Sequence, residues 1–114
     1  MGFANIPRER TLIKLKNIIL QSLQGDSVNV YLFGSWARRE EKRTSDIDIA
    51  LQSNEDIPIE KIVELREKIE ESTLPYHVDL VNLANASSDL TKKVEEEGIL
   101  WKDCKNDWGT QTGH

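Results

Sequence analysis

The segment that most constrains the fold is residues 46–51, DIDIAL, in which polar and apolar side chains alternate. Alternation with a period of two is typical of a β-strand that has one buried face. Three apolar side chains share the face expected to enter the core: Ile47, Ile49 and Leu51. Asp46 and Asp48 share the opposite face, with backbones about 6.5 to 7 Å apart at the usual strand rise. The segment therefore predicts a strand with one core face and one face that carries paired carboxylates.

The rest of the chain predicts a small sheet with helices packed on it. Apolar residues recur at helical spacing in some segments, and β-branched or aromatic residues concentrate in others. The expected helices cover residues 7–23, residues 58–72 and a segment from Ser87 or Ser88 to Gly98; further strands are expected at 28–33 and 76–83, and a short extended piece at 99–102. This order of elements predicts an α/β or α+β domain.

Length and charge limit the possible functions. The chain has 114 residues, enough for one domain with a modest core, which we place at residues 1–103. Residues 104–114 are polar and aperiodic, so we expect a flexible C-terminal tail. The formal net charge of −5 disfavours stable binding to nucleic acid, because such binding depends on neutralising many phosphates.

The sequence also predicts a cytoplasmic location. No apolar run is long enough to cross a bilayer, and the first ten residues lack the features of a secretory signal. The single cysteine, Cys104, excludes an internal disulfide framework. We therefore expect no membrane contact.

A third acid, Asp79, lies among apolar residues in the strand expected at 76–83. If this strand lies beside the DIDIAL strand, three carboxylates crowd together and repel one another unless cations neutralise them. Hard divalent cations such as Mg²⁺ bind carboxylate oxygens together with water and substrate phosphates. Asp46, Asp48 and Asp79 are thus candidate metal ligands. The alternatives are ordinary surface acids for the first two and an ion pair with a basic side chain for Asp79.

Gly34 and Ser35 follow the strand expected at 28–33 and supply a possible phosphate site. Glycine lets the backbone approach a ligand closely, and a following helical turn presents N–H groups to a phosphate. Ser35 adds a hydroxyl donor. The alternative is a simple strand-to-helix connection with a serine cap. Together with the acids, the turn indicates in-line phosphoryl or nucleotidyl transfer.

The motif GSWAR at residues 34–38, followed by SDID at 45–48, resembles the signature of the minimal nucleotidyltransferase (MNT) group in the DNA polymerase beta-like nucleotidyltransferase superfamily. The resemblance is strong over residues 31–51 and fair at 78–80, and the order of elements extends it to about residue 101. It implies the nucleotidyltransferase fold and the transfer of a nucleoside monophosphate, AMP from ATP, to a hydroxyl acceptor with two Mg²⁺ ions.

The resemblance also implies roles for individual residues. Asp46 and Asp48 match the metal ligands, and Asp79 matches a third catalytic carboxylate that helps to activate the acceptor. Gly34 and Ser35 match the triphosphate-binding turn. Arg38 completes the motif and is a candidate nucleotide-binding residue, although pairing with a strand acid is the structural alternative.

Small members of this group commonly act as antitoxins beside an all-helical HEPN partner, and some adenylylate a tyrosine of that partner. The resemblance therefore implies an antitoxin that forms a hetero-oligomer, with a homo-oligomer also possible. The alternative function is a catalytically inactive, nucleotide-binding or steric antitoxin that masks its partner.

Three residues near the motif have roles that the sequence leaves open. Trp36 is either a packing residue or an exposed aromatic that stacks on a base or a partner. His77 shares the expected strand face of Asp79 and is interpreted as a neighbour, because this chemistry needs carboxylates. Arg39 stands where the group usually has glycine, which alters the loop after the motif.

Overall fold

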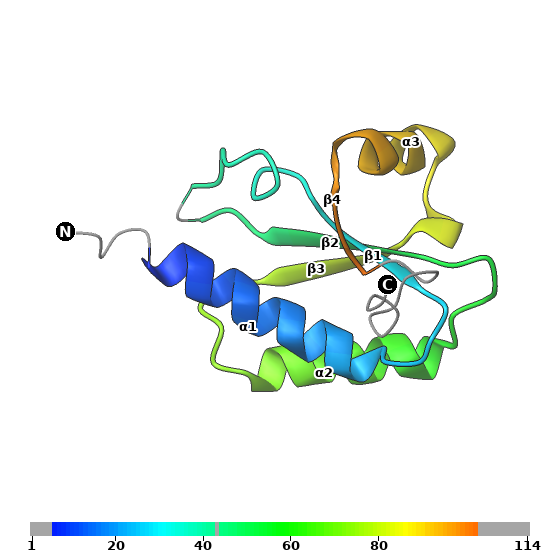
Figure 1. The fold of residues 1–114 in the computed structure, drawn as a ribbon, viewed down its shortest axis with the longest axis horizontal. Helices are drawn as coiled ribbons and strands as arrows, with labels where there is room; N and C mark the ends of the chain where they lie inside the picture. Colours follow the sequence, from blue (N-terminus) through cyan, green and yellow to red (C-terminus); the bar gives the residue numbers. More distant parts are fainter. Residues whose placement is uncertain (1–5, 43, 103–114) are drawn as a thin grey trace, which may run out of the picture.

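The computed structural model describes residues 6–42 and 44–102 (Figure 1). The helices are α1 (Ile6–Ser22), α2 (Ile59–Glu71) and α3 (Ser88–Glu97); the strands are β1 (Asn29–Phe33), β2 (Ile47–Gln52), β3 (Val78–Asn82) and β4 (Ile99–Lys102). The predicted fold class is confirmed. The predicted tail, residues 104–114, lies outside the described residues. Within the described ranges, no helix combines the length and the apolar character needed to cross a membrane.

The four strands form one mixed sheet in the order β3-β2-β1-β4. Strand β1 is antiparallel to β2 and β4, whereas β2 is parallel to β3 and is joined to it by a crossover that contains α2. Asp48 pairs in register with Phe33 on one side and with Asp79 on the other. The strand of Asp79 therefore lies beside the strand of Asp48, which was the condition for bringing the acids together.

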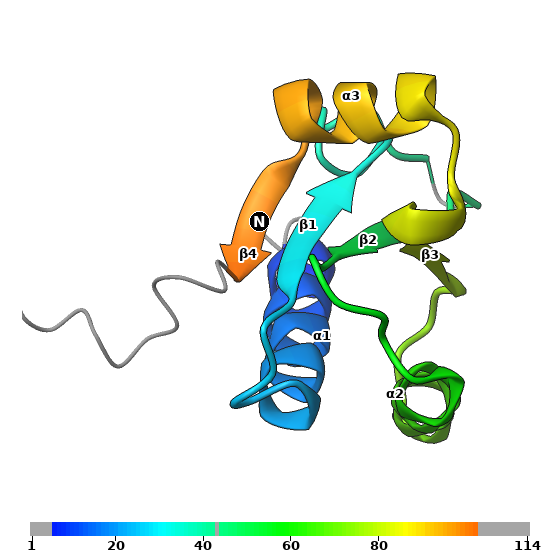
Figure 2. The same cartoon turned by 90° about the vertical axis from the view of Figure 1, so that its right-hand side faces the viewer.

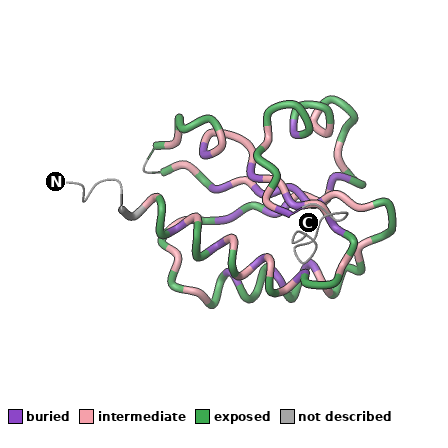
Figure 3. Tube along the Cα trace, in the orientation of Figure 1, coloured by how far each residue is buried: buried purple, intermediate pink, exposed green. Residues whose placement is uncertain are grey.

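The sheet has one closed face and one partly open face. Helices α1 and α2 lie on one side of the sheet and α3 lies on the other (Figures 1 and 2). The main core joins α1 and α2 to the strands and includes the fully buried Leu15, Ile19, Leu32, Ile47, Ile49 and Leu65. A smaller cluster under α3 contains Ala50, Leu83 and Val94. Buried segments follow the strands and the inner sides of α1 and α2 (Figure 3).

Strands β1, β2 and β3 begin one or two residues later than the sequence pattern predicted, and the change matters most at β2. Strand β2 begins at Ile47, whose N–H donates to the His77 carbonyl at 3.0 Å, so that pairing with the neighbouring strand starts there. Before it, the Ser45 N–H donates to the Lys42 carbonyl at 2.9 Å and closes a turn. Asp46 consequently lies between this turn and the strand, not within the strand.

Candidate active site

Asp48 and Asp79 form the centre of the candidate site. They are directly paired across the parallel strands β2 and β3, so their backbones lie about 4.8 Å apart and their side chains share one face. Ala50, two residues beyond Asp48 on the same face, is fully buried in the cluster under α3. Helix α3 thus covers one end of this face, whereas Asp48 is half-buried and Asp79 is exposed.

The surroundings of Asp48 disfavour its ionised form. Burial is the largest cause that raises the pKa of the Asp48 carboxyl, followed by the charges of Asp79 and Asp46, while the Arg38 guanidinium lowers it. The two neighbouring carboxylates therefore act on Asp48 electrostatically, as the sequence predicted for three acids at one place. A group that supplies positive charge would relieve this repulsion.

Asp46 is exposed and lies at the beginning of β2. Among residues 6–42 and 44–102, no three histidine, cysteine, aspartate or glutamate side chains already converge as a set of metal ligands. The donor chemistry nevertheless fits a hard divalent cation, because Asp48 and Asp79 supply carboxylate oxygens from paired strands and Asp46 lies two residues from Asp48. The role of the three acids as metal ligands therefore stays a prediction.

Gly34 brings the turn at residues 34–39, called the motif turn below, close to Asp48. Its φ of +79° lies in the left-handed region, which glycine adopts at little cost. A Cβ atom at this position would overlap the Asp48 carboxylate oxygen Oδ2. Gly34 is thus required both by the backbone conformation and by the close approach of the turn to the acid, and the two halves of the motif meet here.

The segment after Gly34 forms the helical turn that the sequence predicted. The Arg38 N–H donates to the Gly34 carbonyl at 3.2 Å, and the Glu40 N–H donates to the Ser35 carbonyl at 2.8 Å. Within the described part of the chain, the N–H groups of Ser35 and Trp36 have no backbone acceptor. These two N–H groups and the Ser35 hydroxyl are therefore the donors that this turn can offer to a phosphate.

Trp36 is a packing residue, which decides between its two possible roles. Its side chain is 1% exposed, and its indole N–H donates to the Ser45 carbonyl at 3.3 Å. The Tyr76 ring packs edge-on against it with centroids 4.9 Å apart. Trp36 therefore fixes the motif turn to the segment that leads into Asp46, across nine residues of sequence.

Sequence reasoning missed Arg8, which supports the same turn from α1. Its Nη2 donates to the Trp36 carbonyl at 2.7 Å, its Nε pairs with Glu41 at 2.7 Å, and its guanidinium carbon lies 5.6 Å from the Trp36 ring centroid. No sequence spacing joins a residue of the first helix to a turn 28 positions later, so only the fold reveals this contact.

Arg38, the last residue of the GSWAR motif, and Arg39, which follows it, lie in different environments. Arg38 is exposed and pairs with Glu40 at 3.0 Å, whereas the sequence had suggested a strand acid as its structural partner. Its charge still favours the ionised form of Asp48. Arg39 has a φ of +60°, a left-handed conformation that favours glycine and explains why glycine suits this position.

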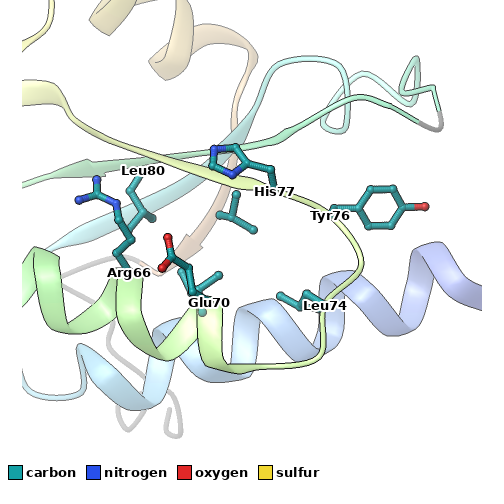
Figure 4. A pocket seen from close by; sticks show the side chains of 8 residues that line it. Arg66, Glu70, Leu74, Tyr76, His77 and Leu80 are labelled. Atoms are coloured by element: carbon teal, nitrogen blue, oxygen red, sulfur yellow. The ribbon is translucent and has the colours of Figure 1, made fainter.

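His77 is exposed and lies just before β3. With Arg66 and Glu70 of α2 it lines a cavity of about 220 Å³ between that helix and β3 (Figure 4). Val78 and Leu80, on the closed face of the sheet, also line this cavity, whereas Asp79 does not. The cavity is therefore not continuous with the acids, and the structure gives His77 no contact with Asp79.

Comparison with known proteins identifies a family match. The family model described as "Polymerase beta, Nucleotidyltransferase" matches residues 14–106. The protein adenylyltransferase MntA of Shewanella oneidensis is 37% identical over 103 residues, which cover 90% of this chain and 66% of that relative. The matched region includes the motif turn and all three acids.

Solved structures show the same fold. A crystal structure of a toxin-antitoxin with AMP-PNP has a chain that is 33% identical, with a TM-score of 0.61 over 84% of this chain and 74% of that one. A structure of the tri-AMPylated Shewanella oneidensis HEPN toxin in complex with MNT antitoxin has a chain that is 29% identical, with a TM-score of 0.57 over 80% of this chain and 71% of that one.

Proposed function

The chain belongs to the polymerase beta nucleotidyltransferase family, and on this basis we propose that it transfers AMP from ATP to a hydroxyl group of a protein acceptor. The observation that carries the proposal is the contact between the two halves of the motif. Gly34 packs against the Asp48 carboxylate, and Asp48 is paired with Asp79. A donor turn for phosphate and a cluster of carboxylates therefore meet at one open end of the sheet.

In the proposed site, Asp46, Asp48 and Asp79 would hold two Mg²⁺ ions. When bound, these ions would neutralise charge on the triphosphate and make its α-phosphorus easier to attack. The chain itself supplies the negative charge that attracts them, and the pKa of Asp48 is raised first by burial and then by the charges of Asp79 and Asp46.

The motif turn orients the nucleotide. The N–H groups of Ser35 and Trp36 and the Ser35 hydroxyl donate to the triphosphate, and Arg38 adds positive charge beside it. Asp79 accepts the proton of the acceptor hydroxyl. The hydroxyl oxygen forms a bond to the α-phosphorus, the bond from that phosphorus to the oxygen of the β-phosphate breaks, and pyrophosphate leaves with the electron pair.

The proposed acceptor is a tyrosine on a helical HEPN-type partner, and the chain acts as the antitoxin of that pair. Two findings support this assignment: the relative of Shewanella oneidensis is a protein adenylyltransferase, and the similar structure contains an AMPylated HEPN toxin in complex with its MNT antitoxin. The alternative is an inactive antitoxin that masks its partner sterically. All three acids are present in this chain, and steric masking does not require them.

The decisive experiment is incubation of the chain with ATP, Mg²⁺ and the HEPN-type protein encoded with it. Intact mass measurement should show the partner gaining one or more AMP groups, and peptide mapping should place them on tyrosine. The Asp48→Asn variant is the control that retains the partner surface but lacks a central carboxylate. Complex formation without any gain in mass would support the steric alternative.

A further inference from the structure

We propose that the groove between α1 and β4 is the surface on which the acceptor protein docks, and that the docking element is an apolar segment flanked by carboxylates; the inference rests on the proposed function. The groove has a volume of about 250 Å³. Its apolar lining comes from α1, β1, the motif turn and β4: Leu12, Ile13, Leu32, Ala37, Ile99 and Trp101. Lys16 and Arg39 are among its charged residues.

The first observation is the exposed apolar character of this edge. Strand β4 is the last strand of the sheet beside β1, so its outer edge has no neighbouring strand among the described residues. Ile99 is 46% exposed and Leu100 is 47% exposed, while Ile13 on the neighbouring helix is 58% exposed. Edge strands of monomeric proteins are usually protected by charged residues or proline, so exposed Ile and Leu here indicate a covered interface.

The second observation is the charge around the groove. Its charged lining residues are the basic Arg8, Lys16 and Arg39 and the acidic Glu9, although the whole chain carries a net charge of −5. Arg8 is engaged by Glu41, but the ion pairs found within residues 6–42 and 44–102 do not include Lys16 or Arg39. A second copy of the chain would place like charges together, whereas a partner with carboxylates beside its apolar contact is complementary.

The third observation is the conformation of Arg39. A non-glycine residue in the left-handed region costs about 1 to 2 kcal/mol, and such outliers cluster at functional sites. Arg39 adopts this conformation with φ of +60° and lines the groove. A glycine here would remove the strain but also the guanidinium, so the chain retains a positive charge at the groove despite the backbone cost.

The groove is linked to the proposed site through the motif turn. Ile99 pairs with Leu32 of β1, and the next residue of β1, Phe33, pairs with Asp48. Two strand spacings, about 10 Å, therefore separate β4 from the strand of Asp48, and three, about 14 Å, separate it from the strand of Asp79. Ala37 and Arg39, which line the groove, belong to the same turn as Gly34 and Ser35. The groove itself lies on the closed face, because Ile99 pairs with the buried Leu32, whereas Asp79 lies on the open face. A protein bound in the groove therefore reaches Asp79 by extending around the motif turn.

The test compares groove variants with matched variants on α2. Ile99→Arg and Arg39→Glu alter the groove; Val63→Arg and Arg66→Glu make the same kinds of change on a helix that lies away from it. Val63 is 41% exposed, close to the 46% of Ile99. Binding of the HEPN-type protein encoded with this chain is measured by calorimetry, and binding of a non-hydrolysable ATP analogue is measured on the same samples to show that each variant is folded.

Both groove variants should weaken partner binding at least tenfold, and both α2 variants should change it less than twofold. Affinity for the ATP analogue should not change in Ile99→Arg or in the α2 variants, because these residues lie outside the motif turn. Full partner affinity in Ile99→Arg and Arg39→Glu would overturn the docking site while leaving the proposed function intact. Concentration-dependent self-association of the wild-type chain that is lost in Ile99→Arg would instead assign the groove to a second copy. If the wild-type chain does not bind the partner, the partner assignment under the proposed function fails, and the docking inference fails with it.

Discussion

The two faces of the sheet are made from alternate residues of the same strands, yet they differ in what covers them. On the face packed against α1 and α2, Ile47 and Ile49 are 0% exposed. On the other face, Asp48 is half-buried and Asp79 is exposed. The covering helices explain the difference, because α1 and α2 have 17 and 13 residues whereas α3 has 10 and lies over only one end of its face.

This difference indicates that residues that stabilise the core and residues proposed for the chemistry alternate along the same strands. A β2 side chain on the closed face, such as Ile49, contributes to the core and lies on the opposite side of the sheet from the candidate site. A side chain one position away lies on the open face, where the half-buried Asp48 carboxylate costs stability and is proposed to act in catalysis. Substitutions at adjacent positions of β2 should consequently have opposite effects, and the predictions below test this separation from the largest expected effect to the smallest.

The largest effect is expected at the centre of the open face. Asp48→Asn removes the carboxylate that is closest to the motif turn and paired with Asp79. Since several kcal/mol of transition-state stabilisation depend on that charge, AMP transfer should fall by about 10⁴-fold or more. A discontinuous assay of AMP incorporation into the partner measures this loss. Residual transfer within tenfold of wild type would contradict the assignment of Asp48 as a metal ligand.

The same variant should be more stable than the wild type at neutral pH. Burial and the charges of Asp79 and Asp46 raise the pKa of Asp48 above its ordinary 3.8, so the folded state binds this proton more tightly than the unfolded state. Stability is therefore lost as pH rises through the folded pKa. Asparagine removes that cost, and denaturant titrations should show a gain at pH 7 that disappears below pH 3.8.

The next effect concerns Asp79, which we expect to remove the proton from the acceptor. Asp79→Asn should lower transfer by about 10²- to 10⁴-fold, the usual contribution of a general base. Because Asp79 is exposed, the fold should not change. Nucleotide and partner affinities, measured by calorimetry, should remain close to wild type. Weak partner binding combined with normal transfer to a small acceptor would show instead that Asp79 belongs to the interface.

Ile49→Ala tests the closed face one residue from Asp48. Ile49 is fully buried in the main core, so truncation should lower the free energy of unfolding by about 2 to 5 kcal/mol. Transfer per folded molecule, measured at a temperature where the variant is still folded, should stay within about twofold of wild type. A specific loss of transfer without loss of stability would show that the two faces are coupled through β2.

The sequence alone predicted the separation of faces in β2, because the alternation of Asp48 with Ile47 and Ile49 is local. It also predicted the turn at Gly34, since glycine and serine after a strand have few interpretations. It did not predict that Asp46 lies outside the strand. That boundary depends on the hydrogen bond from Ile47 to His77, which comes from a segment 30 residues later.

The contacts that assemble the site depend on tertiary structure and were not visible in the sequence. Whether Asp79 meets Asp48 depends on the order of the strands, and several orders are compatible with the same elements. The burial of Trp36 depends on Arg8 and Tyr76, which approach it from distant parts of the chain. The left-handed backbone of Arg39 was not predicted either, although the sequence drew attention to this position because the group usually has glycine there.

A smaller effect is expected in the donor turn that borders the open face. Ser35→Ala removes one hydroxyl donor, whereas the N–H groups of Ser35 and Trp36 remain. Loss of one hydrogen bond to a charged group should weaken binding of an ATP analogue by roughly 0.5 to 3 kcal/mol. Fluorescence or calorimetric titration measures the affinity, and the free energy of unfolding should not change. Unchanged affinity would mean that the Ser35 hydroxyl does not face the triphosphate.

The smallest effect is expected for the stability of variants at Arg39, in the motif turn. Arg39→Gly relieves the left-handed backbone, which costs an ordinary residue about 1 to 2 kcal/mol, but it also increases the entropy of the unfolded chain. The net gain in the free energy of unfolding should be about 0.5 to 1 kcal/mol, measured in denaturant. Arg39→Ala is the matched control, because it removes the same guanidinium and retains the strain. If both variants gain the same stability, charge rather than backbone conformation is responsible. If only the glycine variant gains stability while both variants lose affinity for the partner, Arg39 reduces the stability of the fold and contributes to binding. Asp48 on the open face would then be a second residue that reduces stability and contributes to function.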